Sequence, residues 1–247
     1  MRWNMNAIIT GGTRGIGHAI AKKLASNNYN LILTYHNLDS NAMKVREELE
    51  KVYNVKVLIF KMDVSKEEDV KKLLELANKE FDKVDLLVNN AGIAIDSMVE
   101  DKTVENFNKI LNTNLIGPFL TCKYIGKTMY NNKSGRIINI SSTNAIDTYY
   151  PEGMDYDASK AGLNSLTHNF ATLYSPYVLV NAIASGWVNT DMNKDMDITI
   201  RKNEEKKILL NRFADPEEIA EVVYFLSYAS YINSAIIRVD GGTYKGE

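Results

Sequence analysis

Several features that identify common protein classes are scarce in this sequence of 247 residues. The one cysteine, Cys122, cannot form an internal disulfide, and we expect a buried, unreactive thiol in a reducing compartment. The three histidines, at positions 18, 36 and 168, have no carboxylates or cysteines at ligand spacing, so we predict no metal site. The nucleophile elbow G-x-S-x-G is absent, which argues against a Ser-His-Asp hydrolase.

An excess of one charge and long apolar runs are also missing. The 29 basic and 31 acidic residues are well mixed, so neither a basic stripe for nucleic acid nor a polybasic membrane anchor is present. No stretch approaches the roughly 20 apolar residues that cross a bilayer, and the first residues lack a signal-type apolar core. We therefore expect a cytoplasmic protein with a small-molecule partner and no membrane or nucleic-acid partner.

Short strand-like runs alternate with longer helical segments along the chain. The strand-like runs, rich in β-branched and aliphatic residues, lie at 6–10, 30–35, 55–60, 84–90, 135–141, 178–184 and 235–240. Helical patterns lie between them at 15–27, 40–53, 65–81 and 215–230. We expect Ser65 and Asp215 to be the N-caps of the last two helices.

This alternation predicts an α/β fold with a doubly wound parallel sheet of about seven strands and helices on both faces. The chain has only four prolines and no low-complexity tract that would indicate a linker. We therefore expect a single domain over residues 1–247.

A glycine-rich turn follows the first predicted strand, at the edge of the sheet where ligands collect in such folds. The stretch TGGTRGIG, residues 10–17, has glycines at 11, 15 and 17. Glycines allow a tight turn and the close approach of a pyrophosphate, and the following helix presents free N–H groups. Its position between a strand and a helix favours a dinucleotide site over an ordinary tight turn.

A tyrosine and a lysine lie one helical turn apart in YDASK, residues 156–160. Positions i and i+4 share a helix face, so Tyr156 and Lys160 can point into one pocket. A phenol with a pKa of about 10 exchanges protons more readily when a nearby cation stabilises the phenolate. Most such pairs are merely solvated, so the pair needs other residues to define a site.

Taken together, these motifs resemble the short-chain dehydrogenase/reductase family. The spacing Gly-x-x-x-Gly-x-Gly is followed in order by NNAG at 89–92, SS at 141–142, YDASK at 156–160 and VDGG at 239–242. The resemblance covers essentially the whole chain. It implies a Rossmann-type fold, a nicotinamide cofactor and hydride transfer between a ketone and a secondary alcohol.

The resemblance implies catalytic roles for four residues. Tyr156 would protonate the carbonyl oxygen, and Lys160 would stabilise the phenolate and hold the cofactor ribose. Together with a positive nicotinamide ring, Lys160 is expected to lower the phenol pKa by roughly three units. Ser142, rather than Ser141, would hydrogen-bond the substrate oxygen, and Asn114 resembles the asparagine that supports a water-mediated proton path to the lysine.

The resemblance also implies cofactor contacts at the ends of several strands. Besides Tyr156 and Lys160, these are Gly11, Thr13, Arg14, Gly15, Ile16, Gly17, His36, Asn37, Asp63, Val64, Asn90, Ala91, Gly92, Val188 and Thr190. Two departures from the family pattern are Ser185, where proline is common, and Ser234, where glycine is common. We expect a less rigid loop at Ser185 and a minor local change at Ser234.

The end of the second strand predicts NADP(H) in preference to NAD(H). An acid there would bind the ribose hydroxyls of NAD, whereas a basic residue would accommodate the phosphate of NADP. No acid stands at Tyr35 or His36, and Asp39 is displaced by several residues. Arg14, with His36 and Asn37 nearby, is available to meet a phosphate; the alternative for Arg14 is a solvated loop cation.

The substrate stays open. By similarity the nearest subgroup is the 3-oxoacyl-[acyl carrier protein] reductases of fatty acid biosynthesis. However, residues 171–185 offer no basic side chain to an acidic carrier, which leaves Lys133 and Arg136. The alternative is a reductase or dehydrogenase of another small ketone, alcohol or sugar; a non-catalytic NADP-binding sensor and a sugar epimerase are less favoured.

Two segments, 144–156 and 189–207, are expected to form the wall and lid of the pocket. Candidates for an apolar lining are Tyr149, Tyr150, Met154, Met192 and Met196. Long helices expected at about 103–131 and 156–173 would carry apolar residues that need a partner surface, and relatives assemble on these helices. We therefore expect a homotetramer or a homodimer.

Overall fold

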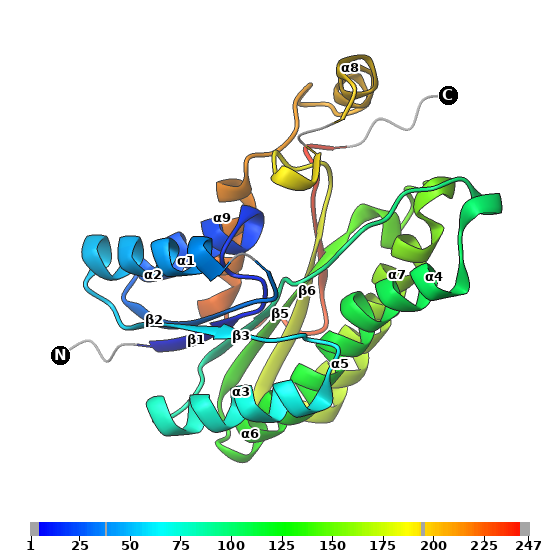
Figure 1. Ribbon diagram of the computed structural model, residues 1–247. Coiled ribbons are helices and arrows are strands. Elements are labelled where there is room, and N and C mark those ends of the chain that lie inside the picture. The colour runs from blue at the N-terminus through cyan, green and yellow to red at the C-terminus, as the bar shows by residue number, and fades with distance from the viewer. Residues whose placement is uncertain (1–4, 38, 194–195, 243–247) are drawn as a thin grey trace.

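Seven parallel strands form one sheet in a computed structural model that describes residues 5–37, 39–193 and 196–242 (Figure 1). The spatial order is β3-β2-β1-β4-β5-β6-β7. The strands are β1 (Met5–Ile9), β2 (Tyr29–Tyr35), β3 (Val57–Lys61), β4 (Leu86–Asn89), β5 (Gly135–Ser142), β6 (Val178–Ser185) and β7 (Ile236–Val239). Each lies within two residues of its predicted bounds, and the doubly wound parallel sheet is confirmed.

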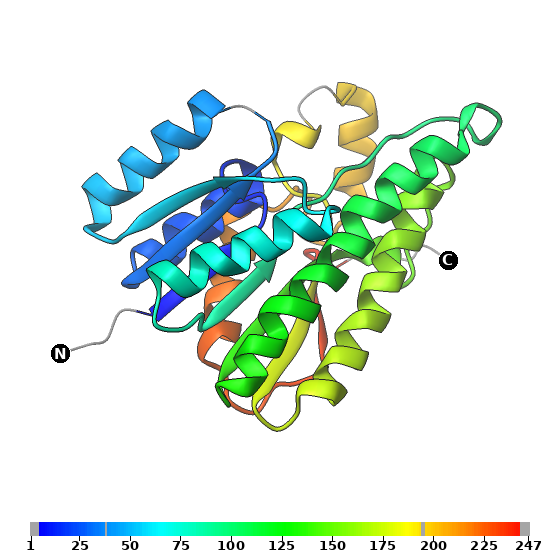
Figure 2. The ribbon, with the colours of Figure 1, turned by 60° about the horizontal axis from the view of Figure 1, so that its bottom comes forward.

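Helices cover both faces of the sheet, as Figures 1 and 2 show. One face carries α1 (Gly15–Ala25), α2 (Asp39–Tyr53) and α9 (Pro216–Tyr228), and the other carries α3 (Glu67–Glu80) and α7 (Met154–Tyr174) with the helix before β5. Successive strand residues point to opposite faces, so Ile9 and Leu33 pack with α1 while Ile8 and Ile32 pack with α3. Burial on both faces explains why the strands are nearly continuous apolar runs.

The helix expected at 103–131 is continuous but contains two wider turns. Its parts are α4 (Val104–Leu111), a π-turn (Asn112–Ile116), α5 (Gly117–Thr121), a second π-turn (Cys122–Gly126) and α6 (Lys127–Asn131). Pro118 follows the first π-turn. Because proline cannot donate to the carbonyl four residues earlier and its ring would clash there, the wider turn relieves the conflict. This turn carries Asn114.

Two local details differ from the sequence-based expectations. The expectation of Ser65 as an N-cap is wrong: Lys66 occupies that position, and the Ser65 hydroxyl donates to Asp63 instead, at 2.6 Å. Asp215 is the N-cap of α9 as expected. Ser234 has φ = 61°, in the left-handed region that favours glycine, so this departure places a side chain in a strained backbone conformation.

The winding of the sheet defines where a ligand fits. From β1 the chain adds β2 and β3 on one side, and then β4 to β7 on the other. The loops after β1 and β4 therefore lead to opposite faces of the sheet from its carboxyl edge, the place where sheets of this kind bind ligands in a crevice. Within the described ranges, no helix combines the length and the apolar character that spanning a membrane requires.

Candidate functional site

The glycine turn connects β1 to α1 at this crevice. Gly11 and Gly15 have φ of 63° and 51°, which glycine adopts without a steric penalty. At Gly17 a Cβ would lie 2.2 Å from the Gly11 carbonyl oxygen, so only glycine fits. Arg14 is the N-cap of α1 and its side chain makes no capping bond, so the first N–H groups of the helix remain available to an anion.

The loop after β4 is bonded directly to the glycine turn. The Asn90 amide donates to the carbonyl oxygens of Thr10 and Gly11, at 2.9 and 3.0 Å. The Thr10 hydroxyl oxygen accepts the backbone N–H groups of Asn90 and Ala91 in return, at 2.9 and 3.0 Å. Asn90 and Ala91 thus hold the two loops together, and the Asn90 amide is already occupied by the protein.

Ser142, Tyr156 and Lys160 meet beside this crevice. Ser142 ends β5, and Tyr156 and Lys160 lie near the start of α7. Ser142 lies close enough to the Tyr156 phenol to influence its pKa, and the Lys160 Nζ atom lies 5.5 Å from the centroid of the Tyr156 ring. Lys160 also donates to the Ile140 carbonyl oxygen at 2.8 Å. Ser141 is bonded elsewhere, to Asn164 at 2.7 Å, which agrees with the choice of Ser142.

Burial dominates the ionisation of both groups. It raises the pKa of the Tyr156 phenol to about 12, while hydrogen bonding to Ser142 acts in the opposite direction and Asp157 and Asp96 add to the rise. Burial also lowers the pKa of Lys160 to about 8. The expected lowering of the phenol pKa involves a positive nicotinamide ring as well as Lys160 and stays a prediction; in the chain by itself, removal of the phenolate from water is the largest effect and raises the pKa.

Asn114 is fully buried and its side-chain amide makes three hydrogen bonds. It accepts the Ile93 N–H and donates to the Ile93 carbonyl, both at 2.9 Å, and it donates to Ser159 at 3.1 Å. Asn114 Oδ1 and Lys160 Nζ would lie 3.4 and 3.6 Å from a Cβ at Gly92. Asn114 thus holds the loop after β4 close to Lys160.

The residues expected at the adenine end lie at the edge formed by β2 and β3. Arg14, His36 and Asn37 are exposed. Burial acts to raise the pKa of Asp63, but hydrogen bonds from Ser65 and the charges of His36 and Lys66 lower it overall. Val64 is buried against Gly117. Leu38 and the side chain of Asp39 lie outside the described part of the chain.

The loop after β6 faces the glycine turn across a cavity of about 320 Å³, lined by Gly15, Asn189, Thr190, Asp191, Asn193 and Arg201. Val188 is buried and bridges to Ala214, and Thr13 is buried beneath the turn beside the half-buried Ile16. Three features fit the binding of a dinucleotide: the tight glycine turn, the uncapped N-terminus of α1 and this cavity. Ser185 is the last residue of β6, and its hydroxyl donates to the Ser141 carbonyl oxygen at 3.4 Å; a less rigid loop at this position stays a prediction.

The substrate side of the site is bordered by exposed apolar side chains. Ile146, Tyr149, Tyr150 and Met154 are exposed and Met196 is half-buried, whereas the side chain of Met192 lies outside the described part. Lys133 and Arg136 lie elsewhere: Arg136 is the second residue of β5 and Ser142 is its last. Within one chain, therefore, these two cations cannot flank the entrance.

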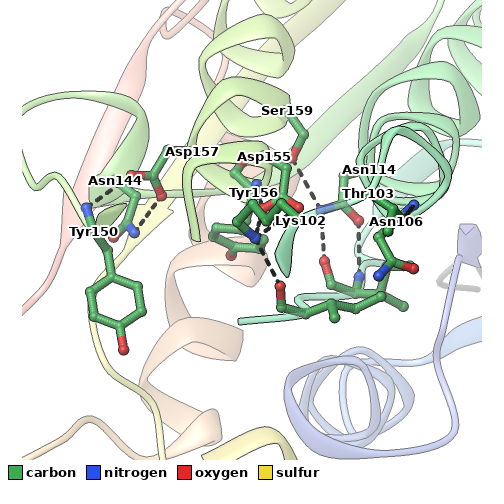
Figure 3. A network of polar contacts seen from close by, with 12 residues as sticks. Lys102, Thr103, Asn106, Asn114, Asn144, Tyr150, Asp155, Tyr156, Asp157 and Ser159 are labelled. Atoms are coloured by element: carbon green, nitrogen blue, oxygen red, sulfur yellow. Dashed lines mark hydrogen bonds and ion pairs between the residues drawn. The ribbon is translucent and has the colours of Figure 1, made fainter. Parts of the chain in front are cut away.

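Sequence reasoning missed three charged residues that surround Tyr156 (Figure 3). Lys102 forms a buried ion pair with Asp155, 3.0 Å from each carboxylate oxygen. Asp157 accepts hydrogen bonds from the Asn144 amide at 2.7 Å and from the Tyr150 N–H at 3.0 Å. An Asp on each side of the tyrosine in MDYDASK was the available signal.

Neither the cysteine nor a metal-ligand cluster contributes to this site within the described part of the chain. Cys122 is buried and free, and burial raises the pKa of its thiol to about 12. Among the described residues, no cluster of three or more His, Cys, Asp or Glu side chains is arranged to hold a metal ion.

Known proteins match this chain over nearly its full length. The family profile described as enoyl-(acyl carrier protein) reductase matches residues 11–244. The 3-oxoacyl-[acyl-carrier-protein] reductase FabG of Aquifex aeolicus is 38% identical, and the match covers 96% of each chain. Glucose 1-dehydrogenase 2 of Bacillus subtilis is 34% identical over 96% of this chain and 93% of its own.

Solved structures show the same fold. The structure described as ElxO with NADP bound has a TM-score of 0.89 at 28% identity, covering 97% of this chain and 98% of its own. Acetoin dehydrogenase YohF of Salmonella typhimurium has a TM-score of 0.87 at 31% identity, covering 98% of this chain and 96% of its own.

The buried Lys160 generates a prediction about stability and pH. Its pKa is about 8 in the folded chain, whereas an unfolded lysine titrates near about 10.4. Between these values the unfolded state holds more protons, so the penalty for burying the ammonium disappears as the pH rises. We expect the free energy of unfolding of the wild type, relative to Lys160→Met, to increase by about 2 kcal/mol from about pH 7 to pH 10. Urea denaturation of both proteins measures this, and a pH-independent difference would contradict it.

Proposed function

Because this chain belongs to the short-chain dehydrogenase/reductase family, we propose that it is an NADP(H)-dependent oxidoreductase that interconverts a ketone and a secondary alcohol. The observation that carries the proposal is the meeting of Ser142, Tyr156 and Lys160 beside the glycine turn. We propose that residues 1–247 act as one domain.

The chain's own residues perform the proton chemistry in this proposal. A bound nicotinamide would supply hydride to the carbonyl carbon or accept it from the alcohol carbon. Ser142 donates a hydrogen bond to the substrate oxygen, and Tyr156 gives that oxygen its proton. A phenol with a pKa of about 12 stays protonated at neutral pH, so Tyr156 carries the proton that the carbonyl oxygen needs.

Lys160 and Asn114 complete the proposed proton chemistry. The Lys160 ammonium stabilises the phenolate left by proton transfer and holds the cofactor ribose. Asn114 supports a water-mediated path that returns a proton to Tyr156 through Lys160. Asn114 Oδ1 and Lys160 Nζ both lie within 3.6 Å of where a Cβ of Gly92 would stand, which supports this role.

Several features support a preference for NADP(H). The exposed Arg14 guanidinium makes no hydrogen bond within the described residues, so it is available to a ribose phosphate. His36 and Asn37 are exposed at the end of β2 beside it, and the ElxO structure has NADP bound. We propose that Gly11, Gly15 and Gly17 face the pyrophosphate, as expected for a glycine turn at a helix N-terminus.

We propose further cofactor contacts on the neighbouring loops. Asp63 and Val64 would flank the adenine, and Asn90, Ala91 and Gly92 would line the middle of the cofactor. Val188 and Thr190 would meet the nicotinamide carboxamide, and the cavity between Thr190 and Gly15 supports this placement.

Two substrate classes compete, and one observation distinguishes them. The relatives include reductases named for 3-oxoacyl-[acyl-carrier-protein], a glucose dehydrogenase and an acetoin dehydrogenase. The loops 93–103 and 143–157 beside Tyr156 contain seven carboxylates and one basic residue, Lys102. Two of the carboxylates are neutralised, Asp155 by Lys102 and Asp147 by Arg238, so five carboxylates remain against no unpaired cation of these loops. This rim would repel an acidic carrier protein, so it favours a free, uncharged ketone.

Assembly and location remain predictions. Exposed apolar residues on the long helices, including Ile116, Phe119 and Leu173, support association through that face. A second exposed set on and after α9, Phe225, Tyr228 and Tyr231, supports a second interface and hence a homotetramer. A cytoplasmic location stays a prediction.

Replacing the proposed acid tests the mechanism. We expect the wild type to oxidise NADPH when given a short 3-oxoacyl thioester, and Tyr156→Phe to lose about 10²–10⁴-fold in turnover. Absorbance of NADPH measures turnover, and NADPH fluorescence should show unchanged cofactor binding in the variant. Near-normal turnover by Tyr156→Phe would refute the assignment. NADPH binding without turnover across a panel of ketones would instead favour the sensor function.

A charge change at the end of β2 tests the cofactor preference. We expect His36→Asp to shift the ratio of NADPH to NADH affinity by about 10-fold toward NADH, because a carboxylate binds ribose hydroxyls and repels a phosphate. His168→Asp is the matched control, since that exposed histidine lies on α7, away from β2. An unchanged ratio in His36→Asp would show that this residue does not face the cofactor.

The same 3-oxoacyl group on two carriers tests the substrate class. We expect kcat/KM to be higher for an uncharged N-acetylcysteamine thioester than for the acyl group on acyl carrier protein. Added salt should narrow this gap by screening the repulsion. Glu152→Lys should raise kcat/KM for the carrier-bound substrate more than for the free one. A higher kcat/KM for the carrier at low salt would favour a carrier-dependent reductase.

A further inference from the structure

We propose that Lys102 and Asp155 form a positioning pair that sets the place of the Tyr156 phenol, and that their effect on turnover is separable from their effect on stability. This inference rests on the proposed function, in which Tyr156 is the proton donor. The two side chains are 53 positions apart in the sequence and belong to the loop after β4 and the first turn of α7.

The pair is buried and its hydrogen bonds are complete. The side chains of Lys102 and Asp155 are 6% and 0% exposed. The Lys102 ammonium lies 3.0 Å from each Asp155 oxygen and 3.1 Å from the Ile95 carbonyl oxygen, so each of its three N–H groups has a partner. Removing two charges from water is costly, and apolar residues of similar size often stabilise a fold as well. Stability alone therefore gives no reason for an ion pair here.

Asp155 acts directly on the backbone of the proposed acid. Its Oδ1 atom accepts the Tyr156 N–H at 3.0 Å. Gly153, at the N-cap of α7, has no side chain to accept the free N–H groups of the first turn. The carboxylate of Asp155 therefore fills this role, and its negative charge is favourable at the positive end of the helix. Lys102 in turn fixes the carboxylate, so the loop after β4 sets the position of the Tyr156 backbone at the start of α7.

The opposite side of Tyr156 is tied to a different loop. Asp157 binds the Asn144 amide and the Tyr150 N–H, and the Asn144 N–H donates to the Ser142 hydroxyl at 3.2 Å. Figure 3 shows Asn144 and Tyr150 on one side of Tyr156 and Lys102 on the other. Tyr156 is thus held between two loops, which are also joined by a hydrogen bond from the Ser97 N–H to the Glu152 carbonyl oxygen at 3.2 Å. On the Lys102 side, the connection is a desolvated ion pair with fixed geometry.

An apolar replacement separates positioning from stability. Lys102→Met alone leaves a buried carboxylate without its cation, and Asp155→Leu alone leaves a buried ammonium, so each single change should lower stability. The double variant Lys102→Met/Asp155→Leu removes both charges and keeps the volume filled. However, it offers no acceptor to the Tyr156 N–H and no directional contact to the loop.

We expect the double variant to unfold in urea near the wild-type midpoint while its kcat stays at least about 10-fold lower. Its NADPH dissociation constant should match the wild-type value within about twofold, because the glycine turn is remote from the pair. Recovery of kcat together with stability would overturn the proposal, since the pair would then be structural only. Wild-type kcat in Lys102→Met would overturn it as well.

A measurement without turnover separates this inference from the proposed function. The groups that face the Tyr156 phenol are Ser142, Lys160, Asp157 and Asp96, and burial keeps its pKa at about 12. In protein labelled with ¹³C at tyrosine Cζ, with Tyr156 assigned through Tyr156→Phe, we expect no titration of this resonance below about pH 10.5. In the double variant, a displaced phenol should titrate nearer its ordinary value. An unchanged titration would overturn the inference even if no substrate were found.

A second buried aspartate provides the matched control. Lys83 lies 2.9 Å from Asp85, whose side chain is 7% exposed, at the amino edge of the sheet. Lys83→Met should also lower stability, but by less than Lys102→Met does, because Lys83 is 50% exposed and Asp85 keeps the hydrogen bond from the Asn6 N–H. It should leave kcat and the Tyr156 resonance unchanged. A loss of kcat in Lys83→Met equal to that in Lys102→Met would show that general destabilisation explains both.

Discussion

The hydrogen bonds between Thr10 and Asn90 join the two loops that diverge at the switch point of the sheet. Without them, the glycine turn and the loop after β4 would be independent surface segments, each free to move on its own strand. With them, the turn has a fixed floor, and Gly92 brings the same loop to Lys160 and Asn114. The ends of the site that we propose for the pyrophosphate and for proton transfer are therefore connected through one hydrogen-bonded loop.

Burial determines the ionisation of the proposed catalytic pair, Tyr156 and Lys160. The same lack of water that raises the phenol pKa to about 12 lowers the ammonium pKa to about 8, so both groups are driven toward their neutral forms. Proton relay needs groups that can exchange a proton. A neutral phenol beside a lysine with a lowered pKa meets this need better than a fixed ion pair would. Charge is tolerated nearby only where it is fully compensated, as it is between Lys102 and Asp155.

Sequence patterns predicted the features that depend on neighbours in the chain. The strands follow from local apolar runs, and the glycine turn and the Tyr156–Lys160 spacing follow from the geometry of a turn and of a helix. The pairing of Lys102 with Asp155 depends on how a loop folds back across 53 positions, which no local pattern reports. The rise in the Tyr156 pKa in the chain by itself could not be read from the sequence for a similar reason, since burial is a property of the whole pocket. Arg136 does not lie at the entrance as expected, because it stands at the opposite end of β5 from Ser142, although the two residues are only six positions apart in the sequence.

The attachment of Asp157 to both Asn144 and Tyr150 has a consequence for how such an enzyme diversifies. The residues that we propose to transfer the proton lie on α7 and at the end of β5, whereas the proposed substrate-contacting surfaces lie on loops. Loops can change in sequence and length without altering the helix, so new substrates can be recruited while the reaction is kept. The Asn144 amide limits this freedom, because a grafted loop that lacks it would release one side of the tyrosine. Substrate specificity can therefore change without loss of the reaction only if a new loop keeps the Asn144 amide that binds Asp157.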